Sequence, residues 1–473
     1  MSTAAIDTEH LSPRAGQTWK IEILIAVLAA GVAAALTQGT VLVIITALAT
    51  FVLAVLRVDA AFFVFVFFLP LAPVVVTGLP IHDVSSLLKI VLFAGIFLGY
   101  ISSKKTSRGR FLGPRLNWLV IGYGLVAFVS VFAFHGANPN SLHALFRLLS
   151  YLSFFFAVIA WVKNQAQMKV AINVLLLSTV VVSLFGIYQA VINDYSDLYF
   201  RLYPLVEQEA GIEPWIGRVP SFLFHFNALA GYLNLVLPFA LALTVMSPSG
   251  ALRRLAGTCF ALGSLTLVLT QSRGGLVAYG AVVLVAVLYL AKSRKTRFWL
   301  LALFPIAAVI AVPIIALYSE RAAHFDELTA VSRLVLFGAA FSMFLSSPII
   351  GVGYGNFREL SATMIPGTTV LIDSHNLYLQ LLSETGIVGL GAFLVIMVGM
   401  MRLALRQFRC PRTPFDQVIG FGAFAAIVSV LVHGLVDFLF IGSPQFGALF
   451  WLVLGLLVAN ELLRTSSAGA SPA

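Results

Sequence analysis

Residues 376–401 read NLYLQLLSETGIVGLGAFLVIMVGMM, a stretch in which Glu384 is the single charged side chain. An α-helix needs about 20 mostly apolar residues to cross the hydrocarbon layer of a bilayer. Runs of this kind recur along the chain, and because lipid cannot satisfy an open backbone, each is expected to be a helix. The fourteen candidate runs lie approximately at residues 20–37, 40–57, 60–79, 86–102, 117–135, 142–162, 169–192, 222–246, 254–271, 274–292, 298–317, 376–401, 416–435 and 440–463.

The composition points to the same class of protein. Of the 473 residues, 60% are hydrophobic and 10% are charged, whereas soluble globular domains carry about 25% charged residues. These values exclude a soluble domain, a disordered chain, a collagen-like fibre and a disulfide scaffold. The sequence predicts an all-α polytopic membrane protein with about 12–14 transmembrane helices, organised as one membrane domain over residues 20–464 between tails at 1–19 and 465–473.

The positive charges predict the orientation. With the N-terminus inside, 21 of the 29 Lys and Arg residues fall in cytoplasmic stretches, as the positive-inside rule requires. Both termini are therefore expected in the cytoplasm, and two long loops at about 193–221 and 318–375 are expected on the opposite face. The second loop is predicted to carry an interfacial helix over Ser332–Ser346, followed by a glycine-rich turn. Eight basic residues also fall on the outward side: Lys89, Arg147, Arg201, Arg218, Arg273, Arg321, Arg333 and Arg358.

Three of the outward arginines are candidates for binding an anion. Arg218 closes the first long loop, Arg273 stands in the motif TQSRGG at residues 270–275, and Arg333 opens the predicted interfacial helix. Guanidinium groups bind phosphate bidentately and stay charged. At the depth of the lipid headgroups, the three arginines indicate a site for a lipid-borne anion. The alternative is that each reaches the headgroups or pairs with an acidic residue.

His375 is the candidate for acid–base chemistry. It stands at the expected outer start of a membrane helix, with Asp373 or Ser374 as the expected N-cap. The positive end of the helix dipole disfavours imidazolium there, and a general base must be neutral. Gly386 and Gly389 fall on the same helical face and would let a neighbouring helix pack closely. The alternative is that His375 only caps its helix or anchors it at the interface.

The remaining ionisable groups have weaker contexts. Glu384 is expected to be buried, and therefore protonated, paired or facing a wet cavity. Asp437 is expected to pair with an arginine. No metal-binding, P-loop or dinucleotide motif is present, so no metal and no cofactor is expected. Structural roles are expected for six further histidines: His82, His135, His143, His225, His324 and His433.

The motifs resemble a known family. The pattern His375-Asn376, nine residues, Gly386-x-x-Gly389 is similar to the signature of bacterial O-antigen ligases. Arg218-Val-Pro-Ser-Phe followed by Asn227-Ala-Leu-Ala-Gly-Tyr resembles another block of that family, although Ser221 stands where glycine is usual. The stretches at 271–274 and 333–357 resemble blocks of the wider ligase and polymerase superfamily.

This resemblance implies a metal-independent, inverting glycosyltransferase of the bacterial inner membrane. Its donor would be a glycan on undecaprenyl diphosphate, its acceptor a hydroxyl of the lipid A core, and its site would face the periplasm. His375 would take the acceptor's proton, and Arg218, Arg273 and Arg333 would hold the diphosphate. The expected supporting residues are Asn227, Asn376, Tyr378, Gly386 and Gly389.

Other functions stay open at this stage. A polymerase of the same superfamily would use the same donor but a second lipid-linked glycan as acceptor, and transfer to protein serines is a further possibility. A transporter of anions or lipid-linked glycans could also use outward arginines. No paired broken helices in two matching halves support a transporter, and no nucleic-acid partner is expected.

Overall fold

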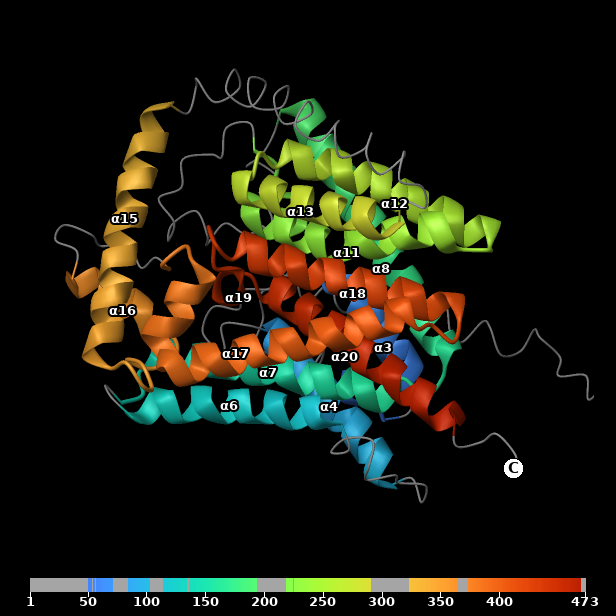
Figure 1. The fold of residues 1–473 in the computed structure, drawn as a ribbon, viewed down its shortest axis with the longest axis horizontal. Helices are drawn as coiled ribbons and strands as arrows, with labels where there is room; N and C mark the ends of the chain where they lie inside the picture. The colour runs from blue at the N-terminus through green and yellow to red at the C-terminus, as the bar shows by residue number, and fades with distance from the viewer. Residues whose placement is uncertain are drawn as a thin grey trace, which may run out of the picture.

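The computed structural model describes residues 50–70 except 53 and 56, 84–102, 114–133, 136–193, 218–290 except 224, 323–364 and 373–468. Within these ranges the chain is helical and contains no strand (Figure 1). The candidate runs at 20–37 and 298–317, most of the run at 40–57 and most of the first long loop lie outside the described residues. The helices are α3 Val58–Phe68, α4 Val84–Ser102, α6 Arg115–Ala133, α7 Pro139–Trp161, α8 Gln165–Ile192, η1 Ser221–Leu223, α11 Phe226–Met246, α12 Gly250–Leu269, α13 Arg273–Leu290, α15 Ala323–Ser346, α16 Phe357–Met364, α17 Leu377–Arg409, α18 Pro414–His433, α19 Leu439–Gly442 and α20 Pro444–Ala468.

The described helices confirm the all-α polytopic fold. In this part of the chain, nine of them are long and apolar enough to cross a membrane: α6, α7, α8, α11, α12, α13, α17, α18 and α20. Their starts carry ordinary helix-start chemistry. Asn138 and Thr413 form capping boxes at α7 and α18, each followed by proline, which satisfies N–H groups that the helix leaves open.

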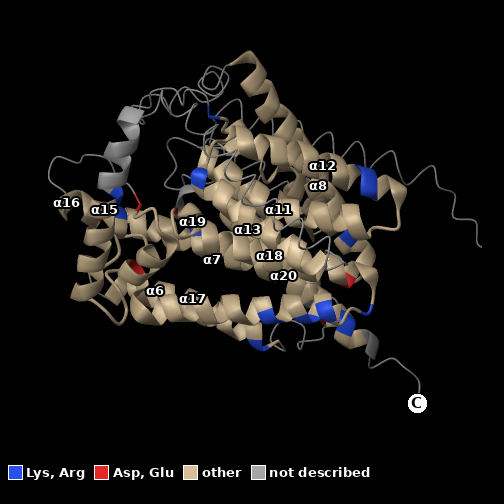
Figure 2. Cartoon of the chain, turned by 45° about the horizontal axis from the view of Figure 1, so that its top comes forward, with Lys and Arg blue, Asp and Glu red and all other residues tan. Residues whose placement is uncertain are grey.

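Burial separates a central group of helices from a peripheral one. In α7, α11, α18 and α20, between 72% and 83% of the spanning window is buried, against 28% to 39% in α6, α12 and α13. The peripheral helices expose large apolar side chains such as Trp118, Leu125 and Val277, as expected of surfaces that face lipid. Figure 2 shows Lys and Arg near both ends of the bundle, with a long uncharged stretch between them.

One long helix runs across the end of the bundle instead of along it (Figure 1). This helix, α15, was predicted over Ser332–Ser346 but begins at Ala323, so Arg333 lies within it and does not open it. After Ser346 the chain turns through Gly351, Gly353 and Gly355, all at positive φ, and enters the short helix α16. The glycine-rich turn predicted from sequence is confirmed.

Candidate active site

The turn after α18, residues 433–437, connects the two helix starts that carry the predicted site. On one side, the Leu377 amide donates to the Gly434 carbonyl at 2.7 Å, and the Asn376 side chain donates to the Leu435 carbonyl at 2.8 Å. On the other side, Gly274 packs so closely that an added Cβ would lie 3.0 Å from the ring of His433. The starts of α13 and α17 therefore meet on this turn.

His375 lies just before α17 with its side chain 33% exposed. The N-cap of α17 is Asn376, whose side chain accepts from the amides of Tyr378 and Leu379 at 3.0 and 2.9 Å. The expectation that Asp373 or Ser374 is the cap was wrong. Because Asn376 supplies the cap, the imidazole of His375 is available for another contact: its Nδ1 lies 3.3 Å from Oδ1 of Asp437.

Asp437 therefore pairs with a histidine. The sequence-based prediction that it pairs with an arginine was wrong. Its Oδ1 also accepts from the Phe438 amide at 2.8 Å. Burial alone would raise the pKa of this carboxyl, but the hydrogen bond with His375 and the nearby histidine charges lower it below its usual range. An ionised carboxylate can only accept, so Nδ1 of His375 carries the proton and Nε2 is left as the basic nitrogen.

His225 is a second histidine in this cluster, and it has the structural role that the sequence predicted. It caps α11, where its Nδ1 accepts from the Asn227 amide at 3.1 Å. Burial lowers its pKa to about 4, and the charges that act on it are those of Asp437, Arg218, His375 and His433. His225 is thus neutral at neutral pH and lies within electrostatic range of both the predicted base and a predicted phosphate-binding arginine.

Arg218 and Arg273 belong to two turns that are joined to each other. Arg218 lies 3.4 Å from the centre of the Phe226 ring, and its Nη2 donates to the Gln271 carbonyl at 2.9 Å. Two residues after Gln271, Arg273 is exposed as the first residue of α13, where the helix dipole favours anions. Arg218 therefore lies against the same turn that presents Arg273.

Asn227 ties these turns together. Its Oδ1 accepts from the hydroxyl of Ser272 at 2.6 Å, and that hydroxyl in turn accepts from the Gly275 amide at 3.2 Å. The Asn227 amide donates to His225. One asparagine thus links the capped starts of α11 and α13, which gives a physical reason for its presence in the second motif.

Arg333 is not connected to this cluster in the same way. It is half-buried on α15, and within the described part of the chain its side chain makes no hydrogen bond or ion pair with His375, Arg218 or Arg273. Another outward arginine, Arg358, pairs with Asp373, which lies two residues before His375. Its guanidinium makes two hydrogen bonds to the carboxylate of Asp373, at 2.8 and 2.7 Å, and so anchors the segment that enters α17.

Gly386 lets another segment pack closely against α17, but that segment is not the neighbouring helix that was predicted. It interrupts α17 with φ 62° and ψ −167°, and the turn after α15 docks into the interruption. The Val352 amide donates to the Ser383 carbonyl at 2.9 Å, and the Ile387 amide donates to the Pro348 carbonyl at 2.9 Å. The close neighbour is therefore a loop and not a helix, and Gly389 makes room for the Thr385 side chain of its own helix.

Tyr378 and Glu384 hold α17 in position against its neighbours. The hydroxyl of Tyr378 donates to the Leu431 carbonyl at 2.7 Å and so ties α17 to α18. Glu384 is fully buried, as expected, and accepts from Gln380 at 2.8 Å and from the Phe357 amide at 3.2 Å. The contact with Phe357 holds the start of α16 against α17, and the contact with Gln380 fixes the carboxylate within its own helix.

A comparison with protein families decides how this cluster is to be interpreted. Residues 258–394 match the model of the family described as O-antigen ligase. Over this segment the chain is similar to the O-antigen ligase family. The matched segment contains Arg273, Arg333, His375 and the motif glycines Gly386 and Gly389. Arg218, His225 and Asp437 lie outside it. The match supports a glycosyltransferase of the O-antigen ligase or polymerase type, and no curated protein matches the chain.

Proposed function

We propose that this protein transfers a glycan from undecaprenyl diphosphate to a hydroxyl of the lipid A core. The observation that carries the proposal is the pairing of His375 with Asp437 on the turn that also receives the start of α13. It brings a basic nitrogen, an orienting carboxylate and the arginine-bearing turns of Arg218 and Arg273 into one cluster. A base and anion-binding groups are the two requirements of direct displacement from a diphosphate.

In the proposed reaction, Nε2 of His375 takes the proton of the acceptor hydroxyl. That oxygen forms a bond to the anomeric carbon, and the bond from this carbon to the diphosphate oxygen breaks. The electron pair leaves with the diphosphate, whose growing charge Arg218 and Arg273 stabilise. Attack from the face opposite the leaving group inverts the anomeric centre. Arg333, on the helix that crosses the bundle end, would contact the diphosphate or its lipid.

We place this site at the periplasmic face of the bacterial inner membrane. The reason is the distribution of basic residues along the chain, which puts the 402–412 and 464 end of the bundle in the cytoplasm by the positive-inside rule. His375 precedes α17 and Arg409 ends it, so the candidate site belongs to the opposite face. Both termini would then be cytoplasmic.

The first test is His375→Ala in the purified protein, supplied with a lipid-linked glycan and an acceptor lipid. Loss of a general base should reduce transfer by about 10²- to 10⁴-fold, while the thermal unfolding midpoint stays close to that of the parent. Near-normal transfer by this variant would exclude His375 as the base.

A second test is Arg273→Lys, which keeps the charge but loses the planar fork of donors. We expect turnover to fall by about 10- to 100-fold, because a phosphate would lose a bidentate contact. Arg402→Lys is the matched control, since Arg402 is exposed at the far end of α17. Equal turnover of Arg273→Lys and the parent would contradict bidentate binding of the diphosphate.

The product distinguishes ligase from polymerase and from transport. A ligase joins the glycan to the lipid A core, a polymerase yields a longer lipid-linked chain, and a transporter yields no new bond. In a deletion strain, bare lipid A core beside long unattached chains would support the ligase. Core that carries a single repeat unit would identify a polymerase instead.

A further inference from the structure

The backbone of His375 is held in a left-handed conformation with φ 51°, which residues with a side chain rarely adopt. Without support, this turn would relax towards an extended or helical conformation and carry the imidazole away from Asp437. The contact with Asp437 is already long, at 3.3 Å, and therefore tolerates little movement. The hydrogen bonds on either side of His375 must hold the turn in place.

The two flanks of His375 are fixed by different groups. After it, the Leu377 amide and the Asn376 side chain both donate to the turn that follows α18. Before it, Ser374 is fully buried, and its hydroxyl donates to the Asn376 carbonyl at 2.9 Å. The Ser374 amide donates to Oε1 of Gln380 at 2.8 Å. Gln380 is thus the side chain that holds the residue before His375.

The side chain of Gln380 has a single orientation. It lies one turn into α17 and is fully buried. A backbone amide can only donate, so the Ser374 amide fixes the side-chain oxygen of Gln380 towards itself. Nε2 of Gln380 then faces Oε1 of Glu384, to which it donates at 2.8 Å. Both ends of the glutamine amide are therefore paired.

Glu384 supports Gln380 from one turn further along α17. It is fully buried, and its Oε1 also accepts from the Phe357 amide at the start of α16, at 3.2 Å. The next residue of α16, Arg358, makes two hydrogen bonds to Asp373. The short helix α16 is therefore joined to the segment that enters α17 in two ways, directly at Asp373 and through Glu384 and Gln380.

We infer that Gln380 is a positioning residue for His375. Because it is fully buried, it acts through the Ser374 amide and the left-handed turn that directs the imidazole to Asp437. The positioning role rests on the proposed function, in which His375 is the base. A general base must lie within hydrogen-bond reach of the proton that it takes, and a misplacement of about 1 Å can cost about 100-fold in rate. Gln380 thereby contributes to kcat and not to binding of the donor.

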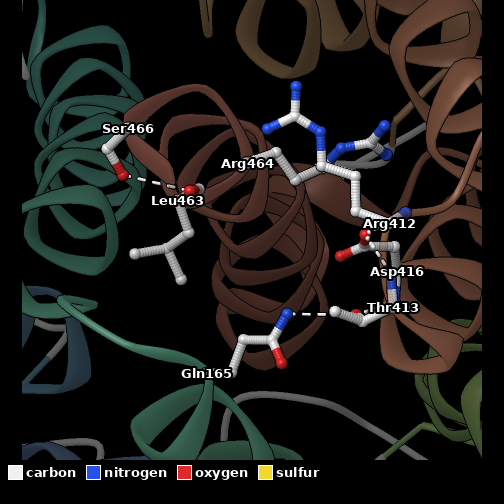
Figure 3. A pocket seen from close by; sticks show the side chains of 7 residues that line it. All are labelled: Gln165, Arg412, Thr413, Asp416, Leu463, Arg464 and Ser466. Atoms are coloured by element: carbon white, nitrogen blue, oxygen red, sulfur yellow. Dashed lines mark hydrogen bonds between the residues drawn. The ribbon is translucent and has the colours of Figure 1, made fainter. Parts of the chain in front are cut away.

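Gln407 provides a matched control on the same helix. It is also fully buried, its Nε2 donates to the Leu457 carbonyl at 2.9 Å, and its Oε1 accepts from Asn460 at 2.9 Å. Asn460 also donates to Asp416, which lines a pocket at the end of the bundle opposite to His375 (Figure 3). Replacing Gln407 therefore removes a comparable pair of buried hydrogen bonds far from the candidate site.

The test compares Gln380→Met with Gln407→Met in the purified full-length protein, at a temperature at which both are folded. Methionine keeps the length of the side chain but lacks the amide group. In Gln380→Met, the Ser374 amide should exchange its hydrogen with solvent about tenfold faster than in the parent. Its kcat should fall by about 10- to 100-fold, with the donor KM within about twofold of the parent. Gln407→Met should lower the unfolding midpoint by a similar amount but keep the parental kcat, KM and Ser374 exchange rate.

Gln380→Glu is the second variant, because it keeps the size and polarity of the side chain if methionine prevents folding. One carboxyl oxygen can still accept from the Ser374 amide. A proton shared with Glu384 replaces the lost donor, because two adjacent buried carboxylates do not both ionise. We expect this variant to keep the Ser374 amide protected and to retain kcat within about threefold of the parent.

Three results would overturn the positioning role. They are a parental kcat in Gln380→Met, equal losses of kcat in Gln380→Met and Gln407→Met, and a low kcat in Gln380→Glu although its Ser374 amide stays protected. Failure of the proposed function gives a different result, because His375→Ala would then transfer the glycan normally.

Discussion

His375, Gln271 and Ser221 share an uncommon backbone conformation, with φ of 51°, 51° and 48°. In the described part of the chain, four residues other than glycine have positive φ, and three of them adjoin the candidate site. The left-handed region costs an L-residue roughly 1–2 kcal/mol, and such strain tends to gather at functional sites. Here it marks the turns that present His375, Arg273 and Arg218.

The same observation explains a departure from the family pattern. Position 221, where glycine is usual, adopts a conformation that glycine enters freely. Ser221 occupies it with compensation: its amide donates to Gln189 at 2.9 Å, and its hydroxyl donates to the Val182 carbonyl at 2.8 Å. Two buried hydrogen bonds thus offset the strain.

Asp437→Asn tests whether this carboxylate orients His375. Asparagine keeps the size of the side chain and can still accept from the Phe438 amide, but it lacks the charge that holds the proton on Nδ1. We expect kcat to fall by about 100-fold with the donor KM unchanged, and Asp437→Glu to recover part of the loss. Full activity of the asparagine variant would remove the orienting role.

At the scale of elements, the interruption of α17 makes one rigid unit of three segments: α17, the turn at 347–356 and α16. Backbone hydrogen bonds cross between the turn and α17 in both directions along residues 383–388. An added Cβ on Gly386 would collide with the Ile349 carbonyl, and one on Gly351 would collide with the backbone at Glu384. The glycines are therefore required where two backbones touch.

Gly386→Ala should consequently destabilise the protein by about 3 kcal/mol or more, from the clash and from a backbone conformation that only glycine adopts readily. Gly391→Ala is the control in the same helix, because no atom lies within 4 Å of its added Cβ. It should stabilise by up to about 1 kcal/mol. Thermal unfolding of both variants checks the contrast, and equal midpoints would contradict the docked turn.

At the scale of the whole molecule, the buried helices α7, α11, α18 and α20 form the frame on which both ends are built. The turn after α18 contacts the starts of α13 and α17 at one end of the bundle. Because the site joins elements distant in sequence, its stability should follow that of the whole bundle.

Acid unfolding provides a test at this scale. The pKa of His225 is lowered from 6.5 to about 4 in the folded state, so between these values the unfolded chain binds a proton that the folded chain does not. Stability should therefore decrease as pH falls from about 6.5 to 4, by up to about 3 kcal/mol. Protonation would also break the cap that Nδ1 supplies to α11.

His225→Asn is the matched variant, because asparagine caps helices well and does not titrate. Its unfolding midpoint should fall less than that of the parent over the same pH range. Parallel pH profiles for the parent and this variant would show that His225 does not set the acid sensitivity.

Much of the candidate site could be predicted from local sequence. His375 and Arg273 each stand at a helix start, and helix starts follow from nearby residues. Asp437 could not be assigned, because it lies 62 residues from its partner and a lone aspartate near a helix end offers many pairings. His225 has the structural role that was predicted for it, as the cap of α11, but its position beside Asp437 could not be assigned from sequence for the same reason.

The sequence by itself determined the class of the protein, the long apolar helices of the described residues and the residue types available for chemistry. These depend on hydropathy and on capping, which act over one or two turns of chain. The tertiary structure decided which groups meet: His375 with Asp437, Arg218 with the turn before Arg273, and the turn after α15 with Gly386. Such contacts depend on how the helices pack. Packing brings together residues that are far apart in the sequence, and local sequence patterns do not reveal which of them will meet.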